Sequence, residues 1–157
     1  MKRVNYFSYI TPDGTGDLYT YERMNSQLYC DIMQDMIVTL QEKYEADNFK
    51  VIHYNAKFAS SKYTQKFMKD NDLERYFIKM PAYSPDINII ENFWAILKNR
   101  VNKHCYNNGQ IVDREEFLDF IKSEWRAIET NICENAYASL PNRMAMIMKS
   151  DGQLTKY

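Results

Sequence analysis

Short strand-like runs alternate with segments of helical periodicity along this chain, and that alternation narrows the folds open to it. Runs rich in β-branched and aromatic residues predict strands at 4–10, 49–54 and 75–80. A turn-forming stretch at 11–16 joins the first run to an alternating segment at 17–22, which predicts a hairpin. Strands separated by helices are typical of a mixed α/β sheet with helices on its faces.

Helices are predicted where apolar residues recur at helical spacing behind a residue that can begin a helix. We expect them at about 25–44, 60–71, 89–102, from 113 to about 128, 131–140 and 141–148. Asp113 and Glu116 form a capping box, and Pro141 suits a first helical turn. In the short helix at 60–71, we expect Tyr63, Phe67 and Met68 to face inward.

Two further groups of residues define expected buried faces. They are Ile90, Phe93, Trp94, Leu97 and Val101 in the helix at 89–102, and Phe117, Phe120, Ile121, Trp125 and Ile128 in the helix after Asp113. A turn is predicted between these two helices, at 107–109.

Length and composition limit the classes of protein. The 157 residues are enough for one domain with a core, so we expect a single domain, with the sheet and its helices at 1–103 and C-terminal helices at 104–157. No apolar run approaches the roughly 20 residues of a membrane span, and we expect no membrane partner. Cys30, Cys105 and Cys133 are scattered, which argues against a disulfide frame or a zinc site.

The charge balance bears on nucleic-acid binding. The formal net charge is −1, whereas proteins that grip duplex DNA usually carry a basic surplus. Lys98, Arg100 and Lys103 are the candidate nucleic-acid contacts, but the same residues also suit a solvated helix end. The sequence therefore allows DNA as a partner, but the net charge of the chain does not indicate it.

The run SPDINIIENFW at 84–94 carries the candidate chemistry. It places Glu91 on the first turn of an amphipathic helix, after a turn that contains proline. A carboxylate there can point toward the end of the preceding strand, where a divalent metal can bind. Asp86 is a weaker candidate ligand. A structural interpretation also fits, because Asn88 can cap the helix and Glu91 can complete a capping box.

The run at 84–94 resembles the third acidic motif of mariner-type DDE transposases, and the resemblance extends over nearly the whole chain. Residues 4–18 resemble that family's second strand and the turn after it, and 24–36 the following helix. Residues 53–56 fall where the family has Asp-Asn-Ala, and 142–157 resemble its C-terminal end. The resemblance implies a ribonuclease-H-like mixed sheet flanked by helices, with a helical C-terminal tail.

The resemblance also implies a catalytic set that this chain does not match. In the family, three acidic residues hold two divalent metals around the scissile phosphate. The position of the second aspartate is Tyr54, a neutral phenol with an ordinary pKa of about 10 and a poor magnesium ligand. Tyr54 and Glu91 are thus remnant positions without an intact catalytic set, and we expect no cofactor.

The chain begins where the family's second strand begins, so we expect it to lack the first strand, the aspartate on that strand and the N-terminal DNA-gripping region. Unpaired strand edges are costly. Residues 4–10 can pair with 49–54, another chain can donate a strand, or two copies can exchange elements. We favour association with a partner or with a second copy, through Val4, Tyr6, Ser8 and Ile10.

Three functions remain open. The degenerate triad favours a catalytically inactive domain that acts by protein association in a nuclear or chromatin-linked complex. The nuclear location follows from the resemblance, and a cytoplasmic one is the alternative. The second function is a metal-dependent DNA strand-transfer or nuclease enzyme with non-standard ligands, using magnesium or manganese. The third is a DNA-binding module that does not cleave, against which the near-neutral charge weighs.

Overall fold

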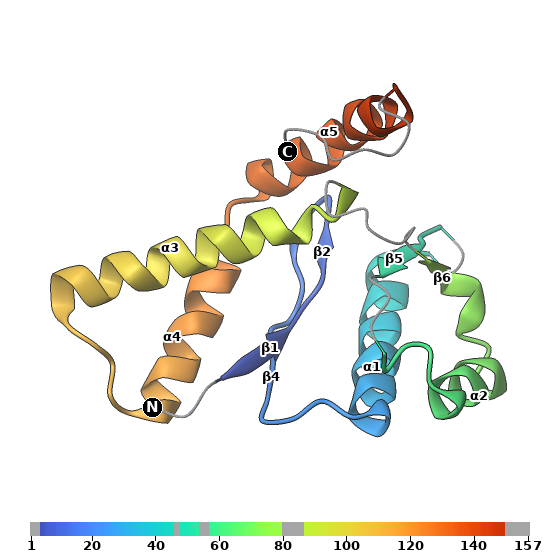
Figure 1. Cartoon of the computed structure of the whole chain (residues 1–157), viewed down its shortest axis with the longest axis horizontal. Helices are drawn as coiled ribbons and strands as arrows, with labels where there is room; N and C mark the ends of the chain where they lie inside the picture. Colours follow the sequence, from blue (N-terminus) through green and yellow to red (C-terminus); the bar gives the residue numbers. More distant parts are fainter. Residues whose placement is uncertain (1–3, 46–47, 54–56, 80–86, 150–157) are drawn as a thin grey trace. The chain divides into compact units, whose positions relative to one another are not determined.

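The computed structural model describes residues 4–45, 48–53, 57–79 and 87–149 (Figure 1). These residues fall into two compact units: a terminal unit, residues 1–22 with 84–157, and a middle unit, residues 23–83. The expected single domain over 1–157, with its sheet and motif helix at 1–103 and its C-terminal helices at 104–157, stays a prediction. No described helix is long and apolar enough to cross a membrane.

The predicted hairpin opens the terminal unit. β1 (Asn5–Phe7) pairs antiparallel with β4 (Tyr19–Tyr21), and β2 (Ile10–Thr11) pairs antiparallel with β3 (Gly14–Thr15). Each predicted arm is therefore interrupted, and the strand expected over 4–10 is two shorter strands.

The two strand pairs differ in register by one residue: Phe7 pairs with Tyr19 and Ile10 with Thr15, and the Tyr9–Gly16 contact continues the second register. The Gly16 N–H donates to the Tyr9 carbonyl at 2.9 Å, and the Tyr9 ring lies where a side chain on residue 16 would be. A Cβ at Gly16 would be 2.3 Å from the nearest ring carbon. The change of register between the two strand pairs interrupts each arm, as an extra residue in one strand does.

Three helices complete the terminal unit: α3 (Ile90–Asn108), α4 (Arg114–Arg126) and α5 (Thr130–Lys149). Their core with the hairpin consists of Leu18, Phe93, Leu97, Ile121, Trp125, Ile128 and Cys133. The other residues expected on the inner faces of α3 and α4 are partly buried against this core, so both predicted faces are confirmed.

Trp125 ties α4 to the hairpin. Its indole N–H donates to the Gly16 carbonyl at 2.9 Å, and the Thr15 hydroxyl donates to the Trp125 carbonyl at 3.2 Å. The indole also stacks on Trp94 of α3, with ring centroids 4.5 Å apart. One buried residue thus joins the hairpin, α3 and α4.

α3 is longer than predicted. It ends at Asn108 instead of about 102, so Asn107 and Asn108 are helical and only Gly109 belongs to the expected turn. No glycine or proline interrupts 103–108. Gly109 ends the helix with a φ of 85°, a conformation that favours glycine, and its N–H donates to the Cys105 carbonyl.

α5 corrects a second expectation. The predicted break at Pro141 is absent, and one helix runs through that proline. Side-chain contacts span the position: the Ser139 hydroxyl donates to the Ala136 carbonyl at 2.6 Å, and Arg143 Nε donates to Ser139 Oγ at 2.9 Å. Arg143 is itself buried, so the turn after the proline is anchored in the unit.

The middle unit is built around α1 (Ser26–Lys43); of the two residues that the sequence offered as a cap, Asn25 and Ser26, it is Asn25 that accepts from the Leu28 N–H, at 2.8 Å. β5 (Val51–His53) pairs parallel with β6 (Phe77–Lys79). The 3₁₀-helix η1 (Glu74–Tyr76) precedes β6, so the strand expected from residue 75 begins at residue 77.

α2 (Lys62–Asp70) lies between β5 and η1 in the chain and is capped by Ser61. Met68 is buried and Phe67 partly buried, as expected, but Tyr63 is 47% exposed and its inward placement is wrong. Thr64 is buried in its stead. The Thr64 hydroxyl donates to the Phe58 carbonyl at 2.6 Å, which satisfies the polar group inside.

Candidate functional site

Glu91 lies exposed on the first turn of α3. The Glu91 N–H donates to the Asn88 carbonyl at 3.1 Å, and the Asn88 amide nitrogen donates to Glu91 Oε1 at 3.3 Å. The expected capping box is wrong, because the N-cap is Ile89 and no side chain caps it. The Asn88 side chain donates to the Glu91 carboxylate instead of accepting from a backbone N–H of the first turn.

Tyr54 and Asp86, the other two residues of the predicted acidic site, lie outside the described residues. The residue before Tyr54 is described: His53 Nδ1 lies 3.2 Å from the Tyr29 hydroxyl, and its ring meets Phe77 edge-on. Burial raises the pKa of Tyr29 to about 12, so its hydroxyl is protonated at neutral pH within hydrogen-bond distance of His53.

Over the residues that the structure describes, no three His, Cys, Asp or Glu side chains are grouped closely enough to hold a metal ion. Among the described residues, the Asn88 amide is the one side-chain hydrogen-bond partner of the Glu91 carboxylate.

The three basic residues predicted as nucleic-acid contacts lie on α3 and differ in their surroundings. Lys98 and Lys103 are exposed. Arg100 is partly buried, and its Nη1 lies 2.9 Å from the Glu124 carbonyl and 3.5 Å from Glu124 Oε2. Arg100 thus helps to join α3 to α4. A nucleic-acid role for the three stays a prediction.

The four predicted interface residues lie along the first arm of the hairpin. Val4 and Ile10 pack against the core of the terminal unit, and Ser8 is buried. Tyr6 is the most accessible, at 36% exposed, and its ring lies 5.2 Å from that of Trp94. Their role in association stays a prediction.

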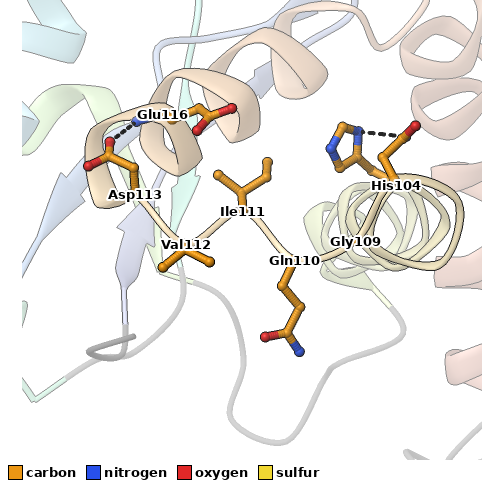
Figure 2. A pocket seen from close by; sticks show the side chains of 8 residues that line it. His104, Gly109, Gln110, Ile111, Val112, Asp113 and Glu116 are labelled. Carbon is orange, nitrogen blue, oxygen red and sulfur yellow. Dashed lines mark hydrogen bonds between the residues drawn. The ribbon is translucent and has the colours of Figure 1, made fainter.

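A cleft that sequence reasoning missed lies where α3 ends and α4 begins (Figure 2). This α3–α4 cleft has a volume of about 730 Å³ and is lined by His104, Asn108, Gly109, Gln110, Ile111, Val112, Asp113 and Glu116. Two features of the sequence could have indicated this cleft: the predicted turn at 107–109 and the predicted cap at Asp113. The cleft depends on the extra length of α3, which the sequence pattern did not indicate.

The chain is similar to known proteins in sequence and in fold. Residues 1–116 match the family model described as DDE superfamily endonuclease. A structure of the Mos1 transposase catalytic domain with raltegravir and manganese is 16% identical, with a TM-score of 0.74 over 98% of this chain and 82% of that one. A crystal structure of the Mos1 mariner transposase catalytic domain is also 16% identical, with a TM-score of 0.71 over 98% and 83%.

The Mos1 mariner paired-end complex with manganese is likewise similar, at 16% identity and a TM-score of 0.73, over 95% of this chain and 44% of that one. No curated protein matches the chain in sequence. At this level of identity the similarity shows the fold: a mixed α/β, ribonuclease-H-like arrangement of small sheets and helices.

Proposed function

The chain belongs to the DDE superfamily endonucleases, and we propose that it is a catalytically inactive member that acts by protein association. The observation that carries the proposal is Tyr54, which stands where the mariner-type resemblance puts the second aspartate. The same resemblance supports a nuclear or chromatin-linked complex as the place of action.

The residues at hand do not fit a pair of divalent cations. Two such ions require several anionic oxygen ligands around the phosphate that they bracket. Glu91 supplies one negative charge, and it lies exposed against the Asn88 amide. The phenol of Tyr54 is neutral at pH 7 and replaces no carboxylate. We therefore assign no step of strand transfer to these residues.

Association is supported by apolar side chains that the terminal unit leaves in solvent. Tyr106 in the last turns of α3 is 91% exposed, and Val112 in the α3–α4 connection is 85% exposed. Scattered apolar residues are normal on a surface, but Val112 lines the α3–α4 cleft. Aromatic residues are enriched in the cores of protein interfaces.

Titration with Mn²⁺ and Mg²⁺ in a calorimeter tests the inactive site. We expect no saturable two-ion binding by the wild-type chain, and the same result for Glu91→Gln and Tyr54→Phe, because one carboxylate does not hold two cations. Two-site binding that Glu91→Gln abolishes, together with loss of plasmid nicking in that variant, would establish the metal-dependent enzyme instead.

A further inference from the structure

Three side chains converge in the α3–α4 cleft. Figure 2 shows Glu116 of α4 and His104 of α3 on opposite sides of it, with Ile111 of the connecting segment pointing into the space between them. Gln110 points away. The volume of about 730 Å³ lies within the roughly 300–1,000 Å³ range of sites that hold small ligands or a few side chains.

The carboxylates of the cleft have different tasks. Asp113 caps α4, since its side chain accepts from the Glu116 N–H at 2.9 Å. The Glu116 carboxylate has no ion-pair partner among the residues that the structure describes. The eight lining residues include no lysine or arginine. The cleft therefore presents a negative charge to whatever enters it.

His104 is held in place on the opposite wall. Its ring packs against Phe120 with centroids 4.3 Å apart, and the Asn108 amide nitrogen lies 3.5 Å from Nδ1. The Asn108 amide nitrogen can donate to Nδ1 of the neutral ring whose proton is on Nε2. Nε2–H can then donate to a carbonyl of a bound segment.

We propose that the α3–α4 cleft binds a protein segment in which an aliphatic side chain neighbours an arginine or a lysine. The aliphatic side chain packs on Ile111, and the cation pairs with Glu116. Charge complementarity selects this partner, because the acidic lining repels the phosphates of nucleic acid. The inference rests on the proposed function and names the surface and partner chemistry of the association.

The cleft is separate from the acidic motif. Glu91 and His104 are both in α3 and 13 residues apart, which corresponds to about 20 Å along a helix. Substitutions in the cleft therefore leave Glu91 and its surroundings untouched, and the cleft can be tested independently of metal binding.

Fluorescence anisotropy of labelled peptides on the full chain tests the inference. The test peptide is acetyl-Leu-Arg-Leu-Arg-Leu-Arg-amide. Two matched peptides carry Glu for every Arg, or Gly for every Leu. We expect saturable binding of the first and at least about tenfold weaker binding of the others, as expected when a charge-assisted contact or an apolar contact is lost.

Variants locate the binding. We expect Glu116→Gln and Ile111→Ser each to weaken binding of the Leu-Arg peptide about tenfold. The control is Glu115→Gln, an exposed acid on the same turn of α4 that does not line the cleft. We expect Glu115→Gln to bind the Leu-Arg peptide with the wild-type affinity. Circular dichroism confirms that each variant is folded.

Three results would overturn the inference. Two of them are equal affinity for the Arg and Glu peptides, and an equal loss in Glu115→Gln and Glu116→Gln. Failure of the proposed function has a different signature, namely two-ion binding that depends on Glu91. A partner that still co-purifies with the chain after Ile111→Ser and Glu116→Gln would place the association elsewhere and would also refute the cleft.

Discussion

Gly16 lets the hairpin meet α4, because its carbonyl accepts from Trp125 while the Tyr9 ring covers its α-carbon. Gly16→Ala places a methyl group 2.3 Å from that ring, so the ring has to move. We expect the free energy of unfolding to fall by about 1–3 kcal/mol, the usual cost of overpacking. Urea unfolding monitored by tryptophan fluorescence measures the change.

Tyr9→Ala supplies the control for this substitution. In that background the added methyl group meets no ring, and Gly16→Ala should cost clearly less than in the wild type. Purely additive effects of the two substitutions would mean that the Tyr9 ring is not what excludes a side chain at residue 16.

α5 continues through a residue that disfavours helices. Proline inside a helix removes one backbone hydrogen bond and costs about 3 kcal/mol relative to alanine, while it restricts the unfolded chain by about 0.4–1 kcal/mol. Pro141 is exposed, so its removal leaves no cavity. We expect Pro141→Ala to raise the free energy of unfolding by about 2 kcal/mol.

Thermal and urea denaturation followed by circular dichroism at 222 nm check this expectation, with Asn142→Ala, also exposed, as the neighbouring control. A loss of stability in Pro141→Ala would indicate that the chain breaks at this position and that the two-helix expectation was right.

The whole chain carries 20 basic and 21 acidic side chains, so its charge offers duplex DNA little attraction. We expect binding to a labelled duplex to be weaker than about 1 μM at physiological salt, typical of contacts that are not sequence-specific. Replacing Lys98 and Lys103 by glutamine should change it little. Submicromolar affinity that falls steeply with salt would instead support the non-cleaving DNA-binding module.

Local patterns in the sequence carried much of this fold. The hairpin, the Asn25 and Asp113 caps, and the inward faces of α3 and α4 all follow from turn chemistry, capping and apolar spacing within a few residues. The order of strands and helices indicated a mixed α/β sheet, the resemblance to mariner-type transposases implied its ribonuclease-H-like class, and the structural comparison agrees. Such signals are readable because each acts between near neighbours in the chain.

Contacts between distant residues set what the pattern left open. The Trp125 hydrogen bond to Gly16 joins residues 109 apart in the chain, and the Arg100 hydrogen bond to Glu124 joins α3 to α4. The inward place of Thr64 likewise depends on a contact outside its helix, the hydrogen bond to the Phe58 carbonyl. The α3–α4 cleft belongs here too, because its walls come from two helices whose ends depend on packing.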